Sequence, residues 1–334
     1  MPIRIAINGF GRIGRLVFRG IYNDPRFAVV AINDLTDSKT LAHLLKYDST
    51  QGKFGGTVEV TATGFQVGKN HVKVTAEKDA KKLDWATDKI DIVVESTGAK
   101  SFRDRAGIQQ HIDAGAKKVL LTVPSKDEID ATIVLGINDS ALKPEHKLVS
   151  NASCTTNCVA PMAKVMLDNF GIETAFMTTI HSYTNDQNIL DAPHSDLRRA
   201  RSAALSIIPT TTGAAKTVGK IIKELKGKID GTSLRVPTPT GSITDLVVNT
   251  TKPVTIEAVN AAFKAAAEGP MKGVLEYSED ELVSVDIIGN PHSCIFDAKS
   301  TMVMGDKMVK IFGWYDNEWG YSMRCVDLLV MMSK

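Results

Sequence analysis

The stretch INGFGRIG, residues 7–14, joins a short apolar strand to the start of a helix through three glycines. Isoleucines alternate with other residues before Gly9, which is typical of a strand that ends there. Apolar residues then recur at helical spacing up to Ile21, and the apolar run 27–32 has strand character again. The stretch therefore predicts a strand–helix–strand unit with a glycine-rich turn.

These glycines fit the pattern G-x-G-x-x-G, in which each glycine has a separate physical task. Gly9 permits a tight turn, Gly11 lets the backbone approach a pyrophosphate, and Gly14 lets the helix pack closely on the strand. The amides at the helix N-terminus then point at the diphosphate. Because the pattern lies between a strand and a helix, it predicts a dinucleotide-binding site.

Asp34 stands at the end of the second predicted strand, twenty residues after Gly14. A carboxylate at this position accepts hydrogen bonds from the adenosine ribose hydroxyls. It would also repel a 2′-phosphate, so the sequence favours NAD over NADP. Asn33 and Asp34 would also suit a solvated turn, but their register with the glycines favours the nucleotide interpretation.

The rest of the first 152 residues continues the alternation of strands and helices. Residues 101–114 have the composition of a helix that Gly115 would end. Apolar strands that alternate with helices imply a parallel sheet covered on both faces. The fold class predicted for residues 1–152 is therefore α/β, with a Rossmann-type doubly wound parallel sheet. Its further strands are predicted at 90–94, 118–123, 132–135 and 148–149.

The pattern changes after about Ser150. The apolar stretch 174–180 leads into His181, and the polar, arginine-rich segment 182–206 has little periodicity, which is typical of a functional or interface loop. We expect residues 153–318 to form an α+β domain with a mostly antiparallel sheet. Its further elements are predicted as a helix from Ala215 to Leu225, strands at 233–236, 243–249 and 302–312 with a hairpin turn at Gly305-Asp306, and a closing helix through 323–330.

Length and composition limit the class of protein. A chain of 334 residues is expected to form two folding units. Its 43% apolar and 23% charged residues indicate an ordinary globular protein, and a formal net charge of +2 gives no reason to expect nucleic acid or a membrane as partner. The sequence has no run of about 18 apolar residues and no secretory signal pattern, so the expected location is the cytoplasm.

The four cysteines are too few and too scattered for a disulfide framework, and a reducing compartment would keep them as thiols. A zinc site needs about four ligands. These cysteines would supply them only if distant segments converged, so no metal is predicted. Cys158, Cys294 and Cys325 are interpreted as small buried hydrophobic residues.

Cys154 differs because it lies in the stretch SNASCTTNC, residues 150–158, whose polar side chains would need partners in a core. The apolar pattern that follows, closed by Gly171, predicts a helix that begins at or just after Cys154. Helix N-termini favour a thiolate and lower a thiol pKa from about 8.5 to roughly 3.5–7.5. We therefore interpret Cys154 as a nucleophile.

A thiolate nucleophile needs a base. Among the seven histidines, His181 stands at the end of an apolar strand before a polar loop, a position where catalytic groups often lie. A hydrogen-bonded structural histidine is the alternative interpretation. The sequence alone does not give its distance from Cys154.

The chain as a whole carries six motifs, INGFGRIGR, SNASCTTNC, HSYTNDQ, DLRRAR, PTTTGAAK and WYDNEWGYS. In this order, and spread over essentially the whole chain, they resemble the motifs of phosphorylating glyceraldehyde-3-phosphate dehydrogenases. The resemblance implies oxidation of D-glyceraldehyde 3-phosphate with NAD and inorganic phosphate to 1,3-bisphosphoglycerate, in glycolysis or gluconeogenesis. The reaction would pass through a cysteine thiohemiacetal and thioester. An erythrose-4-phosphate dehydrogenase with the same chemistry is the alternative.

The resemblance also implies roles for single residues. Cys154 would be the nucleophile and His181 its base. The residues implied in cofactor binding are Gly9, Gly11, Arg12, Ile13, Gly14, Asp34, Thr97, Gly98, Thr122 and Asn317. Those implied in substrate and phosphate binding are Ser153, Thr155, Thr184, Arg199, Thr212, Gly213 and Arg235.

The resemblance further implies a homotetramer in which the loop 182–206 packs at a subunit interface, and a last helix, 319–334, that completes the nucleotide-binding domain. Ala192 replaces a leucine frequent in NAD-using members, whereas Asp34 favours NAD. Two other classes are less favoured. A cofactor-free thiol hydrolase would leave the dinucleotide motif unused, and an RNA-binding protein would need an aromatic stacking platform.

Overall fold

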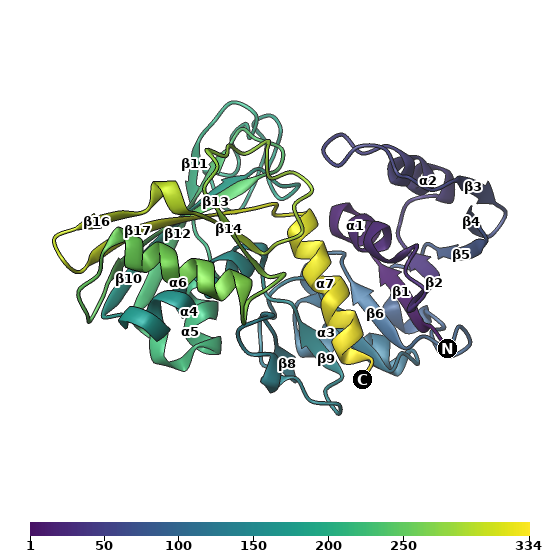
Figure 1. The fold of residues 1–334 in the computed structure, drawn as a ribbon. Coiled ribbons are helices and arrows are strands. Elements are labelled where there is room, and N and C mark those ends of the chain that lie inside the picture. The colour runs from purple at the N-terminus through teal and green to yellow at the C-terminus, as the bar shows by residue number, and fades with distance from the viewer. The chain divides into compact units, whose positions relative to one another are not determined.

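The computed structural model describes all 334 residues, which divide into two compact units (Figure 1). The first unit comprises Met1–Ile133, Ser140–Ala152 and Ser322–Lys334, and the second comprises Val134–Asp139 and Ser153–Tyr321. Each unit is built around its own sheet, in agreement with the expectation of two folding units.

The sheet of the first unit has nine strands in the order β3-β4-β5-β2-β1-β6-β7-β9-β8. Neighbouring strands from β5 to β8 are parallel, and β3, β4 and β5 form an antiparallel meander at one edge. The predicted doubly wound sheet is confirmed, whereas the meander was not predicted. The strands are β1 (Ile3–Asn8), β2 (Phe27–Asn33), β3 (Val58–Thr61), β4 (Gly64–Val67), β5 (Asn70–Thr75), β6 (Ile92–Glu95), β7 (Lys118–Leu121), β8 (Ala131–Thr132) and β9 (Leu148–Ser150).

Helices pack on this sheet because each presents an apolar stripe to it. Residues predicted as one helix at 101–114 form a 3₁₀ turn, η2 (Lys100–Phe102), and then α3, since Asp104 caps α3 by accepting from Gly107 N–H at 2.9 Å. A buried cluster that includes Trp85, Phe102 and Ile108 lies between α3 and the sheet. The helices are α1 (Arg12–Ile21), α2 (Ser38–Lys46), α3 (Arg105–Asp113) and the part of α7 (Trp319–Met332) from Ser322 onward.

The second unit contains a mixed sheet in the order β11-β12-β10-β13-β17-β15-β14, with β16 paired to β17. Most of its pairs are antiparallel, as predicted, but β10 and β12 run parallel, as do β14 and β15. The strands are β10 (Thr174–Ser182), β11 (Ile208–Thr210), β12 (Ile229–Val236), β13 (Ser242–Asn249), β14 (Leu275–Ser278), β15 (Cys294–Asp297), β16 (Met302–Met304) and β17 (Met308–Tyr315).

Three helices lie on one side of this sheet (Figure 1). They are α4 (Cys154–Phe170), α5 (Ala214–Ile221) and α6 (Ile256–Glu268). The helix predicted to continue to Leu225 ends at Ile221, and a 3₁₀ turn, η4 (Lys223–Leu225), follows it. The segment 183–206 contains no helix or strand, as its lack of periodicity predicted. None of the helices combines the length and apolar character that crossing a membrane requires.

Candidate active site

The first unit has a pocket of about 380 Å³ at the carboxyl ends of β1, β2 and β6. The chain leaves β1 toward β2 on one side and later returns to β6 on the other, so this is the point where the strand order reverses. Open α/β sheets bind ligands at such points. The lining residues are Asn8, Gly9, Gly11, Asn33, Asp34, Leu35, Glu77, Lys78, Ser96, Thr97, Ala99, Ser101 and Phe102.

Two glycines of the motif are required by close packing. Gly9 has φ +90°, and a Cβ there would lie 2.5 Å from the backbone nitrogen of Thr97. A Cβ on Gly14 would lie 2.1 Å from the carbonyl oxygen of Gly9. Both positions therefore exclude side chains, in agreement with the tasks that the motif predicts for them.

Gly11 is different, because a Cβ there would meet no atom within 4 Å. It is the N-cap of α1, and no side chain caps that helix end. A helix N-terminus beside open space suits a pyrophosphate. The Arg12 side chain does not point to this space, since its guanidinium pairs with Asp48 and donates to Thr50 Oγ1.

Some of the other predicted cofactor residues of the first unit line the pocket, and others do not. Asp34 lines the pocket and accepts a hydrogen bond of 2.7 Å from Phe10 N–H. Thr97 also lines it, and Gly98 follows with φ +65°. Ile13 and Gly98 are not among the lining residues, nor is Thr122, whose hydroxyl donates to the carbonyl oxygen of Glu95 at 3.0 Å. Asn317 lies in the second unit, with Oδ1 accepting from Gly241 N–H and Ser242 Oγ.

In the second unit, Cys154 is the first residue of α4. Ser153 caps this helix, since its Oγ accepts from Thr156 N–H at 3.1 Å. Ala152, just before the cap, has φ +55°. This conformation costs energy for residues other than glycine and often marks functional sites. The predicted position of Cys154 at a helix N-terminus is confirmed.

His181, on β10, lies beside this cysteine, with Nε2 3.4 Å from Cys154 Sγ. Its Nδ1 lies 2.6 Å from the carbonyl oxygen of Ser182. A carbonyl only accepts, so we assign the proton to Nδ1, which leaves Nε2 to accept the thiol proton. Arg235 Nη1 also lies 3.1 Å from Nδ1, but it donates to the same Ser182 carbonyl at 3.1 Å, and the shorter contact of 2.6 Å from Nδ1 to that carbonyl decides the assignment.

Burial governs the ionisation of both groups. It raises the pKa of the Cys154 thiol, against the lowering effects of Arg235 and of hydrogen bonds from Thr155. It lowers the pKa of His181 to about 3, and the charge of Arg235 acts in the same direction. The expectation that the thiol pKa lies below its ordinary value is wrong, because desolvation outweighs the effects that lower it.

Two arginines surround the pair. Arg235, on β12, stands opposite His181 in the parallel pairing of β10 and β12, and donates to Thr184 Oγ1 at 3.4 Å. Arg199, from the loop 183–206, donates to Thr210 Oγ1 at 3.0 Å and to the Thr211 carbonyl at 3.4 Å, and it pairs with Asp186. Burial and the charge of Arg199 both lower the pKa of Arg235, so the site concentrates positive charge.

The remaining predicted phosphate residues lie around this charge. Thr212 Oγ1 accepts from Ala214 N–H at 3.2 Å, and Gly213 is the N-cap of α5 with no side-chain cap. Thr155 is buried, and its hydroxyl lies 3.0 Å from the hydroxyl of Tyr315.

Comparisons with known proteins match both units. The family model described as the glyceraldehyde 3-phosphate dehydrogenase NAD-binding domain matches residues 3–103, and that of the C-terminal domain matches residues 153–317. Glyceraldehyde-3-phosphate dehydrogenase 2 of Streptomyces avermitilis is 56% identical over 334 residues, 99% of each chain. The enzyme of Geobacillus stearothermophilus is 56% identical over 98% of this chain and 97% of its own, and that of Borreliella burgdorferi 57% over 99% and 100%.

The chain belongs to the glyceraldehyde-3-phosphate dehydrogenase family. It is therefore an NAD-dependent oxidoreductase, and NAD is its cofactor. The glycine geometry, the open space at Gly11 and the acceptor Asp34 fit a dinucleotide. These observations agree with the choice of NAD that the sequence indicated.

Sequence reasoning missed some residues that this dehydrogenase places at its sites. Asn8 and Asn33 line the nucleotide pocket, and a polar residue at the carboxyl end of an otherwise apolar strand was the available signal. Tyr315 is buried, and its hydroxyl lies 3.0 Å from that of Thr155 and 2.7 Å from that of Thr179. It gave no separate signal because it lies in the alternating pattern of β17.

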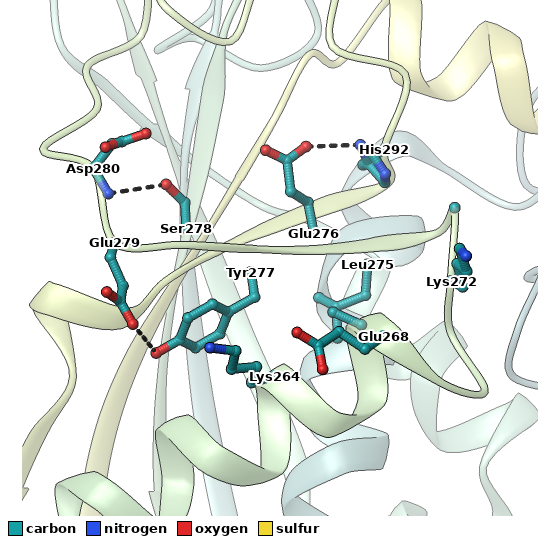
Figure 2. A pocket seen from close by; sticks show the side chains of 12 residues that line it. Lys264, Glu268, Lys272, Leu275, Glu276, Tyr277, Ser278, Glu279, Asp280 and His292 are labelled. Atoms are coloured by element: carbon teal, nitrogen blue, oxygen red, sulfur yellow. Dashed lines mark hydrogen bonds and ion pairs between the residues drawn. The ribbon is translucent and has the colours of Figure 1, made fainter.

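A pocket of about 590 Å³ in the second unit of this dehydrogenase contains none of the predicted site residues (Figure 2). Its charged groups are exposed or paired with one another. Glu276 pairs with His292 at 2.8 Å, and the Tyr277 hydroxyl donates to Glu279 at 3.0 Å. It contains no paired nucleophile and base, so no part of the reaction is assigned to it.

Proposed function

We propose that the chain oxidises glyceraldehyde 3-phosphate with NAD and inorganic phosphate to 1,3-bisphosphoglycerate, in glycolysis or its reversal. The observation that carries this proposal is the contact of 3.4 Å between Cys154 Sγ and His181 Nε2 at a helix N-terminus beside two arginines. Relatives of 52–57% identity over nearly the whole chain bear the name of this enzyme. The alternative erythrose-4-phosphate dehydrogenase is therefore not favoured.

Cys154 is the nucleophile in this proposal. As Sγ attacks the aldehyde carbon, its proton passes to His181 Nε2, and the adduct is the alkoxide of a thiohemiacetal. The Cys154 N–H at the start of α4 stabilises the developing oxyanion, an effect typically worth about 3 kcal/mol per donor. This step needs both partners in their neutral forms, which burial favours.

His181 then acts a second time. It first gives the thiol proton to the alkoxide oxygen, which forms the thiohemiacetal hydroxyl, and it then takes this hydroxyl proton as the hydride leaves the carbon, so that a thioester carbonyl forms on Cys154. NAD, when bound, supplies the hydride acceptor for this oxidation. The Nδ1–H bond to the Ser182 carbonyl keeps the ring oriented through both transfers.

The arginines bind phosphate groups in this proposal. Arg235 is the better supported of the two, because its Nε is buried without a hydrogen-bond partner, a costly arrangement that an anion would relieve. With Thr184 it would hold the substrate's own phosphate. Arg199, Ser153, Thr155, Thr212 and Gly213 would hold the attacking inorganic phosphate, which Gly213 could bind at the uncapped end of α5.

The two units have separate tasks in this proposal. The first unit binds the adenosine and pyrophosphate of NAD, and the helix that ends the chain completes this unit. Asn317 of the second unit contacts the nicotinamide carboxamide, and the second unit carries the chemistry.

The second unit also carries the contacts of a homotetramer. The exposed Leu197, Leu205 and Ile207 support such contacts. Light scattering should give about four times 36.1 kDa, and a monomer mass would contradict this assembly. We also infer a cytoplasmic location.

A turnover assay tests the function. The purified chain, NAD, glyceraldehyde 3-phosphate and inorganic phosphate should give NADH, followed by its absorbance, at a rate that depends on phosphate. Cys154→Ser should abolish turnover, and Cys158→Ser, one turn deeper and buried, serves as the matched control. If NADH forms equally fast without phosphate, or if Cys154→Ser keeps turnover, the proposal is wrong.

A further inference from the structure

A buried carboxylate, Glu95, ends β6 beneath the nucleotide pocket without lining it. It is 1% exposed, and four donors converge on it. Thr97 N–H and Thr97 Oγ1 donate to Oε1 at 2.9 and 2.5 Å, and Asn8 Nδ2 donates to Oε2 at 2.5 Å. His111 Nε2 lies 3.0 Å from the same Oε2. Glu95 therefore acts only as an acceptor, and all its bonds stay inside the first unit.

The direction of these hydrogen bonds is fixed from one end by Trp85. The indole Nε1–H can only donate, and it lies 3.1 Å from His111 Nδ1. His111 must therefore accept at Nδ1, carry its proton on Nε2, and donate to Glu95. Both rings are buried, at 1% and 0% exposed, so no solvent competes for these positions.

The same direction continues into the pocket wall. Because Asn8 gives Nδ2 to Glu95, its Oδ1 faces Asn33, whose Nδ2 donates to it at 2.8 Å. Asn33 Oδ1 in turn accepts from Thr75 Oγ1 and Glu77 N–H, both at 2.8 Å. Neither amide can turn over without breaking its neighbour's bond. Asn8, Asn33 and Glu77 all line the nucleotide pocket.

Glu95 also shapes the turn that follows it. While Thr97 Oγ1 donates to Glu95, it accepts from Ala99 N–H at 3.1 Å, which fixes residues 97–99. This turn packs directly on Gly9, and His111 stacks on Phe102 with ring centroids 5.4 Å apart. Thr97, Ala99 and Phe102 are lining residues too.

We propose that Glu95, His111 and Trp85 are positioning residues for the adenosine half of NAD. They do not touch the nucleotide, but they fix the orientation of the Asn8 and Asn33 amides in the pocket wall and hold the wall formed by residues 97–99. The inference rests on the nucleotide-binding function proposed for this unit.

Glu95→Gln is the sharpest test, because it changes hydrogen bonding at nearly constant shape. Whichever way the new amide is placed, its NH₂ meets donors, either Thr97 N–H or Asn8 Nδ2 and His111 Nε2–H. We expect the Kd for NAD and for ADP-ribose, measured by calorimetry, to rise equally, by at least about tenfold, since buried donors are left unpaired. The KM for NAD should rise with it, while kcat at saturating NAD and the KM for glyceraldehyde 3-phosphate stay unchanged.

Two further variants make the test decisive. Trp85→Phe removes the donor that fixes the His111 tautomer and should raise both Kd values about threefold, so it decides the question if Glu95→Gln does not fold. Asp130→Asn is the control, because Asp130 is also a carboxylate acceptor in the first unit, for Lys147 N–H, Leu148 N–H and Arg105 Nη2, away from the pocket. It should lower Tm without changing either Kd.

Unchanged Kd values in folded Glu95→Gln, or in Trp85→Phe if the first variant does not fold, would overturn the inference. So would an equal loss of affinity in Asp130→Asn, which would show a general effect of stability. A wild-type chain that binds neither NAD nor ADP-ribose would instead refute the nucleotide-binding function itself, and the inference with it.

Discussion

At the level of single residues, the contact between Cys154 and His181 joins two groups that burial would each keep neutral. Proton transfer across 3.4 Å creates two opposite charges whose attraction offsets part of the cost of charging buried groups. The two groups therefore titrate as a pair. Without its partner, the thiol keeps only the pKa that burial gives it.

His181→Asn tests this dependence through the reactivity of the thiol. The pKa of Cys154 in the variant should lie above that of the wild type, because burial raises the pKa of the thiol and no proton acceptor then opposes this effect. At neutral pH, alkylation of Cys154 by iodoacetamide should be slower than in the wild type by on the order of tenfold, and should rise steeply only in alkali. Peptide mapping measures the rate, and the buried Cys158 and Cys294 are internal controls. Identical pH profiles would contradict the pairing.

Arg235→Lys tests the phosphate site. Lysine keeps the charge but loses the planar fork that contacts Ser182 and Thr184, so the KM for glyceraldehyde 3-phosphate should rise about tenfold. Arg201→Lys is the matched control, since Arg201 is exposed and pairs only with Asp191 at 2.7 Å. Steady-state kinetics measure both. An unchanged KM in Arg235→Lys would remove Arg235 from the site.

Single residues were predictable where a local pattern carries the signal. Polar neighbours and a following helix singled out Cys154, and the glycine spacing located the nucleotide turn. The partner distances were not predictable, because β10 and β12 bring His181 and Arg235 together across 54 positions of sequence. The sign of the thiol pKa shift was missed because burial depends on tertiary packing.

At the level of elements, the strand–turn–helix of residues 3–21 depends on two glycines in different ways. Gly14 gives close packing between α1 and the turn, whereas Gly11 leaves open space at the helix N-terminus. The two positions therefore separate stability from nucleotide binding.

Gly14→Ala and Gly11→Ala should differ accordingly. The first places a methyl group 2.1 Å from the Gly9 carbonyl and should cost about 1–3 kcal/mol of unfolding free energy together with NAD affinity. The second meets no protein atom, so Tm should stay near that of the wild type while the new methyl group occupies the space for the pyrophosphate and weakens NAD binding. Thermal unfolding and calorimetry measure the two effects. Wild-type affinity in Gly11→Ala would contradict the placement of the pyrophosphate.

Elements with strong periodicity were predictable, and elements with weak periodicity were not. The strands and helix nearest the glycine motif follow their apolar patterns. The meander β3–β5 was missed because its strands have four to six residues and mix exposed with buried positions. The helix α6 was missed because its apolar residues are mostly small alanines, which give little contrast between its two faces.

At the level of the whole molecule, two sheets with separate cores form the two units. Nucleotide binding belongs to the first unit, and Cys154, the proposed nucleophile, lies in the second. The parallel and antiparallel sheets were predictable from strand spacing. The placement of residues 134–139 with the second unit was not, because this short segment lies between strands of the first.

Ligand binding should stabilise the unit that binds. NAD at 100 times its Kd should add about 2.7 kcal/mol to the unfolding free energy of the nucleotide-binding unit and raise its Tm. Cys154→Ser should gain the same stabilisation, since that position belongs to the other unit. Scanning calorimetry with and without NAD measures the shift. No shift in the wild type would contradict the assignment of the pocket.

The central claim, that the sulfur of Cys154 carries the acyl group, is tested most directly by mass spectrometry. The protein is mixed with NAD and glyceraldehyde 3-phosphate without inorganic phosphate. Its mass is measured first for the intact chain and then for the peptides of a digest. We expect one phosphoglyceroyl group per chain, on the peptide that contains Cys154, and its loss when phosphate is added. An unmodified Cys154 while NADH forms, or an acyl group on another residue, would contradict the account.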